Sequence, residues 1–313
     1  MTTLVAAGVD VGRDFLDVAL APSGQAFRVA NQPAGIATLL QRLKRSGVQK
    51  VVIESIGSFG ARLVRALADA GLDTGIVDPR RIRALRLAEG RRAKTDRLDA
   101  ALIARFALTM HDAARPVPSA ATFQIRALST RRRQLVELAA IEKTRLKQAL
   151  DPIIADSCRR AVAALAEERH LIEDQLATLL GEQPDHQRRV TLLRTIPGFG
   201  PAVTTTLLAD LPELGTLDRR AIASLAGLAP HANQSGTRTG PDHIQGGRPC
   251  VRVALYCAAL SAARSDKGFK REYLAMRANG IPAKVALIAI ARKLVVAANG
   301  MLKDNHPWHP TQP

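Results

Sequence analysis

Four carboxylates in the N-terminal third of the chain have the types and spacing that could do chemistry. Asp10 lies inside an almost wholly apolar stretch, Glu54 ends a second one, and Asp96 and Asp99 open a helical segment. Because Asp96 and Asp99 are three residues apart, they share one face of that helix. Oxygen-rich clusters suit Mg²⁺ or Mn²⁺, and paired metals suit phosphodiester chemistry. The four acids could therefore converge on one metal site, although Asp10 alone also fits an edge or turn aspartate bonded to backbone.

A dense basic run lies just before the helical pair of acids. It offers positive charge where a nucleic-acid backbone would approach the acids, so it predicts phosphate contacts. A solvated helix face would explain part of the same run. The residues concerned are Arg80, Arg81, Arg83, Arg86, Arg91, Arg92 and Lys94.

The stretch 196–200, Ile-Pro-Gly-Phe-Gly, predicts a turn between two helices. It is typical of a helix-hairpin-helix, in which glycines let the backbone approach a phosphate and the next helix presents its N-terminal amides. We expect Gly198 and Gly200 to contact nucleic acid in this way. The alternative is a glycine turn between two packed helices.

A polar, glycine-rich loop is expected after an apolar helix that ends at Gly227. Ser235 precedes a glycine in this loop. Three arginines that follow it are expected to contact nucleic acid, namely Arg238, Arg248 and Arg252. Taken alone, a loop serine is usually a turn residue.

The elements that must position the acids read as a mixed α/β domain. Strands are expected over 4–11, 15–21 and 25–30, with a hairpin turn at 12–14. A helix from Pro33, a strand over 51–54, a helix over 61–70 and a strand over 74–77 follow. Periodicity alone gives no more than this fold class.

Residues from about 120 to 182 are expected to form two long helices, interrupted at Asp151-Pro152. Leucines at near-heptad spacing predict a coiled coil, within one chain or between two, and plain helix packing is the alternative. The run Arg131-Arg132-Arg133 is expected to lie largely on the outer face. Further helices are expected from Pro249 through Leu260 and over 282–302.

Composition favours a polyanionic partner. The chain has 313 residues, 47% of them hydrophobic, and a net charge of +17. Such an excess of positive charge is most simply explained by DNA or RNA, with a membrane surface as the rival. We expect no apolar run long enough to span a bilayer and no signal peptide. Three cysteines without a C-x-x-C pair favour a reducing cytoplasm.

Asp10, Glu54 and the Lys-Thr-Asp-Arg-Leu-Asp-Ala block resemble the DEDD insertion-sequence transposases, which include the pilin-gene invertase. The Ile-Pro-Gly-Phe-Gly turn and the Gly-Leu-Ala-Pro…Gln-Ser-Gly segment resemble the C-terminal transposase domain of the same family. The resemblance covers nearly the whole chain in order. The order of the predicted elements also resembles the ribonuclease H-like fold, called RuvC-like, in which a first-strand Asp, a fourth-strand Glu and late helical acids form the site.

The resemblance implies a RuvC-like domain over 1–118, a helical coiled-coil region over 119–185 and a mainly α transposase domain with a helix-hairpin-helix over 186–313. Asp10, Glu54, Asp96 and Asp99 would bind divalent metal, and Ser235 would be the nucleophile. One departure is that the stretch 240–248 is less basic than expected after that serine.

Members of this family resemble recombinases guided by a structured bridge RNA that pairs with donor and target DNA. They act as dimers that join into tetramers, with the active site shared between the acid domain of one subunit and the serine domain of another. Two other functions fit the residues. One is a hydrolytic, junction-resolving nuclease that uses only the acids and water, and the other is a non-enzymatic nucleic-acid scaffold.

Overall fold

The computed structural model describes residues 4–54, 59–90, 95–109, 115–116, 120–182, 184–235 and 238–309, without the side chains of 115, 116, 120, 231–235 and 238–242. The chain forms two compact units, Met1–Ala120 and Ala121–Pro313. Each unit has its own buried core, and each is described separately below.

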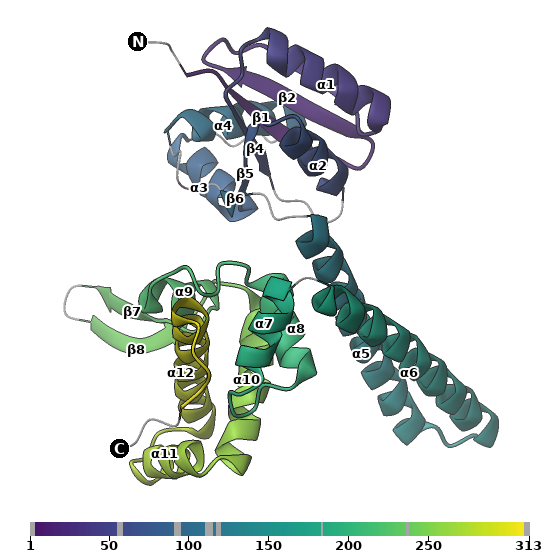
Figure 1. Cartoon of the computed structure of the whole chain (residues 1–313), viewed down its shortest axis with the longest axis vertical. Helices are drawn as coiled ribbons and strands as arrows, with labels where there is room; N and C mark the ends of the chain where they lie inside the picture. The colour runs from purple at the N-terminus through teal and green to yellow at the C-terminus, as the bar shows by residue number, and fades with distance from the viewer. Residues whose placement is uncertain are drawn as a thin grey trace. The chain divides into compact units, whose positions relative to one another are not determined.

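The N-terminal unit is built on one mixed sheet, drawn in purple and blue in Figure 1. Its strands lie in the order β3-β2-β1-β4-β5-β6. The first three are antiparallel neighbours, β1, β4 and β5 are parallel, and β6 is antiparallel to β5. The strands are β1 (Ala6–Val11), β2 (Phe15–Ala21), β3 (Ala26–Ala30), β4 (Lys50–Glu54), β5 (Asp73–Val77) and β6 (Arg115–Pro116). The five predicted strands are confirmed to within two residues, whereas β6 was not predicted.

Three predicted helices follow the strands in the expected order, whereas the helix over 79–88 was not predicted. The helices of this unit are α1 (Pro33–Arg45), α2 (Ala61–Asp69), α3 (Pro79–Ala88) and α4 (Asp96–Thr109). Helix α1 starts at Pro33 because the fixed φ of proline suits a first helical position, and it buries Ile36, Leu39 and Leu43 on one stripe. The sheet and its helices confirm the α/β architecture of a RuvC-like domain.

Two long helices open the C-terminal unit, α5 (Ala120–Gln148) and α6 (Pro152–Gly181). The break between them is where it was predicted, because Asp151 caps α6 by accepting hydrogen bonds from the Ile153 and Ile154 amides. An ion pair of 2.6 Å joins Arg132 on α5 to Glu173 on α6. The two helices form the hairpin visible in Figure 1, and a coiled coil stays a prediction.

The rest of this unit is mainly helical around one core. Its helices are α7 (Pro184–Leu193), α8 (Pro201–Asp210), α9 (Arg219–Leu225), α10 (Pro249–Ser265), α11 (Lys267–Ala278) and α12 (Ala283–Asp304). Fully buried leucine and isoleucine side chains from α8, α10 and α12 meet in this core, among them Leu207, Leu255 and Ile290.

Helix α12 corrects one expectation. Among the described helices it has the length and apolar composition of a membrane span, although no such run was predicted. Nine of its residues are buried, and seven of these belong to the C-terminal core, among them Ala291 and Leu294. We therefore interpret α12 as a core helix, for which burial within the protein explains the apolar sequence.

The predicted loop after Gly227 is wrong, because strands β7 (Pro230–Ser235) and β8 (Arg238–Ile244) form an antiparallel hairpin there. Pro230 lies opposite Ile244, and the pairing is irregular between His231 and Asn233. Glycine, proline and aspartate are depleted in strands, so the sequence of β8 gives no strand signal. Backbone pairing with β7 makes the strand.

Candidate active site

Two parallel strands bring Asp10 and Glu54 together. Val9 on β1 lies opposite Ile53 on β4, and the two acids follow these paired residues directly. Their backbones are therefore neighbours at the carboxyl ends of adjacent strands. Both side chains are half-buried.

Helix α4 adds the other two acids from its first turn. Thr95 precedes the helix, and its hydroxyl accepts a hydrogen bond from the Leu98 amide at 3.3 Å. Asp96 and Asp99 then lie where the positive end of the helix dipole favours acids. Gly8 lets α4 approach β1 closely, since a Cβ at that position would lie 2.1 Å from the Ala104 nitrogen. A glycine on the strand thus sets the distance between the acids.

The electrostatics of Asp10 reflect this clustering. Its pKa rises from 3.8 to about 7, first because burial disfavours the carboxylate. The negative charges of Glu54, Asp96 and Asp99 raise it further, and so does a fifth acid, Asp17. All four acids predicted from the sequence therefore share one electrostatic environment in the N-terminal unit.

Asp17 and its partner Arg28 were missed by the sequence analysis. Strand register places Asp17 opposite Asp10 and Arg28 opposite Asp17. The Arg28 guanidinium donates to both Asp17 oxygens, at 2.8 Å from Nη2 and 3.0 Å from Nε, and reaches Asp96 at 3.4 Å. Counting residues outward from the predicted turn at 12–14 pairs Asp10 with Leu16, so the sequence analysis misses the observed register by one residue.

A second arginine holds the other helical acid. Arg86 on α3 lies 3.3 Å from Asp99, and both side chains are largely buried. This contact gives Arg86 a structural role, while its predicted phosphate contact stays a prediction. Three further arginines of α3 are exposed, namely Arg80, Arg81 and Arg83. Phosphate contacts were also predicted for Arg91, Arg92 and Lys94, which lie outside the described residues.

The donor set fits a hard divalent cation, because every member is a carboxylate and their mutual repulsion favours a positive ion. The side-chain positions do not yet form a complete ligand set. Among the described residues, no three His, Cys, Asp or Glu side chains are grouped closely enough to hold one ion. Both helical acids already have cationic partners, since Arg28 lies 3.4 Å from Asp96 and Arg86 lies 3.3 Å from Asp99.

The predicted nucleophile lies on the hairpin of the C-terminal unit. Ser235 ends β7, and its backbone pairs with Arg238 at the start of β8. The side chains of both residues lie outside the described part of the structure. Their roles as nucleophile and phosphate contact stay predictions.

Arg248 and Arg252 make contacts inside the C-terminal unit. Arg248 binds the Glu213 carboxylate with both terminal nitrogens, at 2.5 and 2.6 Å, and also the Asp210 carbonyl at 2.7 Å. Arg252 donates to the Gly246 carbonyl at 3.0 Å. These contacts order the segment that follows the hairpin, and nucleic-acid contacts by these arginines stay predictions.

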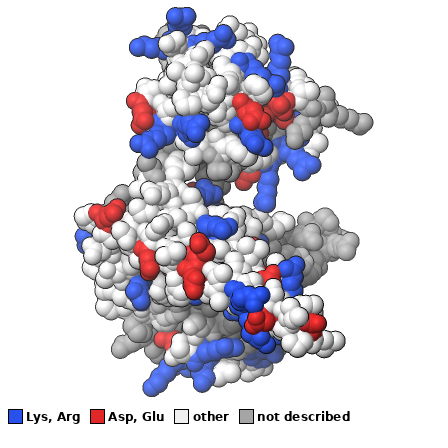
Figure 2. All heavy atoms as spheres, turned by 90° about the vertical axis from the view of Figure 1, so that its right-hand side faces the viewer, with Lys and Arg blue, Asp and Glu red and all other residues white. Residues whose placement is uncertain are grey.

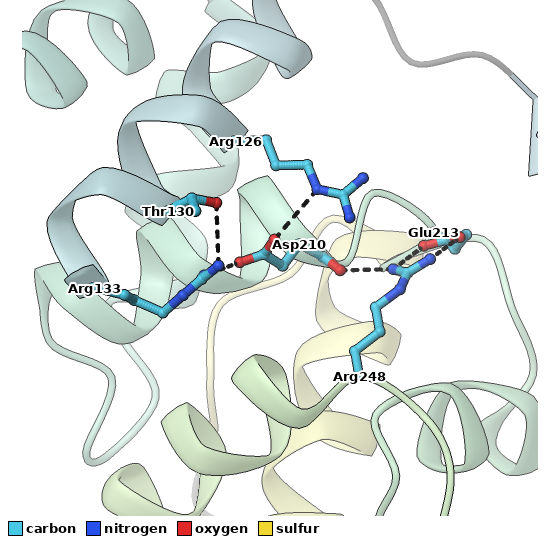
Figure 3. A network of polar contacts seen from close by, with 6 residues as sticks. All are labelled: Arg126, Thr130, Arg133, Asp210, Glu213 and Arg248. Carbon is cyan, nitrogen blue, oxygen red and sulfur yellow. Dashed lines mark hydrogen bonds and ion pairs between the residues drawn. The ribbon is translucent and has the colours of Figure 1, made fainter. Parts of the chain in front are cut away.

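The Arg248 contact belongs to a larger network around the buried carboxylate of Asp210 (Figure 3). Arg133 contacts one Asp210 oxygen, and Arg126 lies 3.5 Å from the other. Both arginines come from α5, whereas Asp210 ends α8. The expectation of an outward-facing Arg131-Arg132-Arg133 run is therefore wrong for Arg132 and Arg133, because buried or half-buried acids on neighbouring helices pair with them.

The predicted glycine turn lies between α7 and α8. Gly198 has a φ of 83°, and a Cβ there would lie 2.2 Å from the Ala258 carbonyl oxygen of α10. Gly200 caps α8, with open space where a Cβ would be. Close packing on α10 explains Gly198, so a phosphate role for the two glycines stays a prediction.

Basic side chains are not confined to these predicted sites. On the face drawn in Figure 2, Lys and Arg are spread over the surface with Asp and Glu among them. Surface charge alone therefore does not single out one nucleic-acid interface on that face.

Comparison with known proteins finds two family models. Residues 7–155 match a transposase model named for DEDD transposases of the IS110 type, and residues 190–274 match the IS116/IS110/IS902 family of transposases. The first match contains all four acids, and the second contains the glycine turn and Ser235.

Similar proteins point the same way. The pilin gene-inverting protein of Moraxella bovis is 27% identical over 266 residues, 82% of this chain and 81% of its own. A 44.8 kDa protein of insertion element IS116 from Streptomyces clavuligerus is 32% identical over 127 residues, 40% of this chain and 32% of its own.

A solved structure, T. thermophilus RuvC in complex with Holliday junction substrate, is 18% identical with a TM-score of 0.27, and it aligns over 36% of this chain and 99% of its own. The fold assignment rests on the sheet order and not on this likeness. Two models of one transposase family match this chain in order, and they decide to which family it belongs. This chain belongs to the IS110-type transposases and recombinases, enzymes of DNA transposition and recombination.

Proposed function

We propose that this enzyme cleaves and rejoins DNA through a phosphoserine intermediate, with Ser235 as nucleophile and a divalent metal at the acid cluster. The observation that carries the proposal is the gathering of acids from β1, β4 and the first turn of α4, which, together with burial, raises the pKa of Asp10 to about 7. Carboxylates that lie close together despite their mutual repulsion, and whose pKa values are shifted by it, are typical of functional sites. Family membership supports the assignment of Ser235.

Asp10, Glu54, Asp96 and Asp99 are the residues that would hold Mg²⁺ or Mn²⁺. When bound, a divalent cation supplies positive charge that stabilises the attacking and leaving oxygens of a phosphodiester. Release of Asp96 from Arg28 and of Asp99 from Arg86 would free two ligands for it. The two arginines then remain beside the site as positive charges for the DNA phosphate.

The serine reaction balances without ATP. The Ser235 oxygen bonds to a DNA phosphorus and gives its proton to water, while one phosphorus–oxygen bond to deoxyribose breaks. The deoxyribose oxygen leaves as a hydroxyl after it takes up a proton. Attack by a hydroxyl of another strand on the phosphoserine reverses these steps and rejoins DNA, because each step exchanges one phosphoester bond for another.

Sequence choice is proposed to come from a bridge RNA that pairs with donor and target DNA, in dimers that assemble into tetramers. Family membership supports this part, and the net charge of +17 suits a protein that holds two kinds of nucleic acid. The exposed arginines of α3, at 80, 81 and 83, are candidates for backbone contacts beside the acids.

The test is covalent trapping on donor DNA with the co-purified RNA present. Wild-type protein should give a protein–DNA adduct, and Ser235→Ala should give none while it still binds DNA. Ser224→Ala, an exposed serine at the end of α9, is the matched control and should leave the adduct unchanged. An adduct that persists in Ser235→Ala would remove this serine from the role.

A hydrolytic nuclease is the second candidate, because the acids alone could activate water, as in other metal-dependent phosphodiesterases. It predicts cleaved DNA with free ends at an unchanged rate in Ser235→Ala. A non-enzymatic scaffold predicts unchanged biology after loss of all four acids, and it is disfavoured because the chain belongs to an enzyme family.

A further inference from the structure

A groove of about 1990 Å³ lies in the C-terminal unit, and the described residues that line it include none of the predicted site residues. Its walls come from α9, the base of the β7–β8 hairpin, α10, α11 and α12. Pockets for small molecules usually measure about 300–1,000 Å³. The size of this groove therefore suits a segment of a polymer better than a metabolite.

The apolar residues that line the groove, here called its floor, are partly exposed. Helix α12 contributes Val285, Ile288 and Val296, whose spacing places them on one helix face. The Val285 side chain is 55% exposed. Trp308, which stacks on Phe269 with ring centroids 5.8 Å apart, also lines the groove. A contiguous apolar surface of this kind marks a binding site.

Most charged residues that line the groove are basic, and the charged residues are here called its rim. Asp266 and Glu272 are the acids that line it, and both are engaged: Asp266 caps α11 through the Phe269 amide, and Glu272 pairs with Lys293. In the described part of the chain, the other cations of the rim have no carboxylate within ion-pair distance. These cations are Arg219, Arg220, Lys267, Arg271, Lys284 and Arg292. The charge of the rim therefore favours an anionic occupant.

We propose that this groove binds a single-stranded segment of nucleic acid, with phosphates on the basic rim and unpaired bases on the apolar floor. A duplex presents phosphates but hides the flat faces of its bases, so only an unpaired strand satisfies both surfaces. The base of the hairpin forms one wall, through Pro230, His243 and Ile244. A strand in the groove therefore lies against the element that carries Ser235.

The inference rests on the proposed function only in taking nucleic acid as the substrate. It needs neither the acid cluster nor Ser235 to be catalytic. The Asp10→Asn and Ser235→Ala variants should therefore bind single strands normally. A failure of the groove and a failure of the recombination mechanism are distinguishable for that reason.

The first test measures fluorescence anisotropy of a labelled oligothymidylate with the full chain. Arg271→Glu on α11 and Lys284→Glu on α12 change the rim. Lys270→Glu and Lys303→Glu are matched controls, because they reverse a charge at exposed positions of the same helices outside the groove. Each rim variant should weaken binding about tenfold and reduce the salt slope by about 0.7 per lost phosphate contact. Equal losses in all four variants would overturn the proposal.

The second test separates base contacts from phosphate contacts. Val285→Asn changes the floor, and Leu274→Asn on α11, also 55% exposed but outside the groove, is its control. Val285→Asn should weaken oligothymidylate binding about fivefold and leave an abasic strand of equal length unaffected. Equal weakening for both strands, or for a duplex, would contradict the base contacts. Displacement of the strand by polyglutamate at lower concentration than by unlabelled oligothymidylate would instead assign the groove to an acidic protein.

Discussion

At the scale of single residues, the acid cluster is defined by charge crowding. Asp10 is half-buried among carboxylates and has two arginines near its neighbours, Arg28 at Asp96 and Arg86 at Asp99. A cluster arranged in this way stores repulsion that a cation relieves, and stability and metal binding are therefore linked.

The pKa of Asp10 predicts a pH-dependent effect of Asp10→Asn on stability. The folded pKa of about 7 exceeds the ordinary value of 3.8, so the folded protein loses stability as pH rises through this window. Without divalent metal, Asp10→Asn should raise the melting temperature at about pH 8 and have little effect at about pH 4. Asp14→Asn, at an exposed carboxylate, is the control and should leave the melting temperature unchanged at both pH values. A lower melting temperature for Asp10→Asn at the higher pH would contradict the raised pKa.

Arg28→Gln should tighten Mn²⁺ binding. The guanidinium competes with a cation for Asp96, and its loss also adds net negative charge to the site. The gain is expected to be about fivefold at most, since an exposed ion pair is weak. Calorimetric titration of the full chain measures it, with Arg42→Gln as the control because Arg42 lies over Phe27 instead. Weaker binding in Arg28→Gln would show that Arg28 positions the acids for the metal.

At the scale of elements, Asp210 connects the long helix α5 to the end of α8. Its carboxylate is 4% exposed and has arginine contacts from two turns of α5, while its carbonyl accepts from Arg248 (Figure 3). Removal of a buried acid that lies between two arginines is costly, because it leaves their positive charges uncompensated.

Asp210→Ala should lower the free energy of unfolding of the C-terminal unit by about 3–5 kcal/mol. Asp156→Ala on α6 is the matched control: it also removes an acid with two arginine partners, but at an exposed position, so about 0.5 kcal/mol or less is expected. Urea denaturation followed by circular dichroism measures both. Equal losses would mean that burial adds nothing to the Asp210 network.

At the scale of the whole molecule, the acids and Ser235 belong to different compact units. The proposed oligomer shares each active site between subunits, and this makes a complementation test available. Ser235→Ala and Asp10→Asn should each be inactive alone. Mixed after reversible dissociation, they should recover part of the wild-type recombination, because some sites then combine an intact acid cluster with an intact serine. No recovery in verified mixed oligomers would assign both groups to one subunit.

The sequence by itself determined the strand–helix order of the N-terminal unit and the four acids. Continuous apolar runs and helix spacing are local properties, so β1–β5 and the first turn of α4 follow from residue types. The break at Asp151-Pro152 is local for the same reason, since proline starts a helix and aspartate caps it.

Tertiary structure decided the rest. Strand register pairs Asp17 with Arg28, close packing at Gly8 sets the distance between α4 and β1, and Asp210 meets Arg133 across 77 residues of chain. The β7–β8 hairpin replaced an expected loop because backbone pairing outweighs a poor strand sequence. These features depend on which surfaces meet, and burial of a charge stabilises a fold only when its partner arrives from another element.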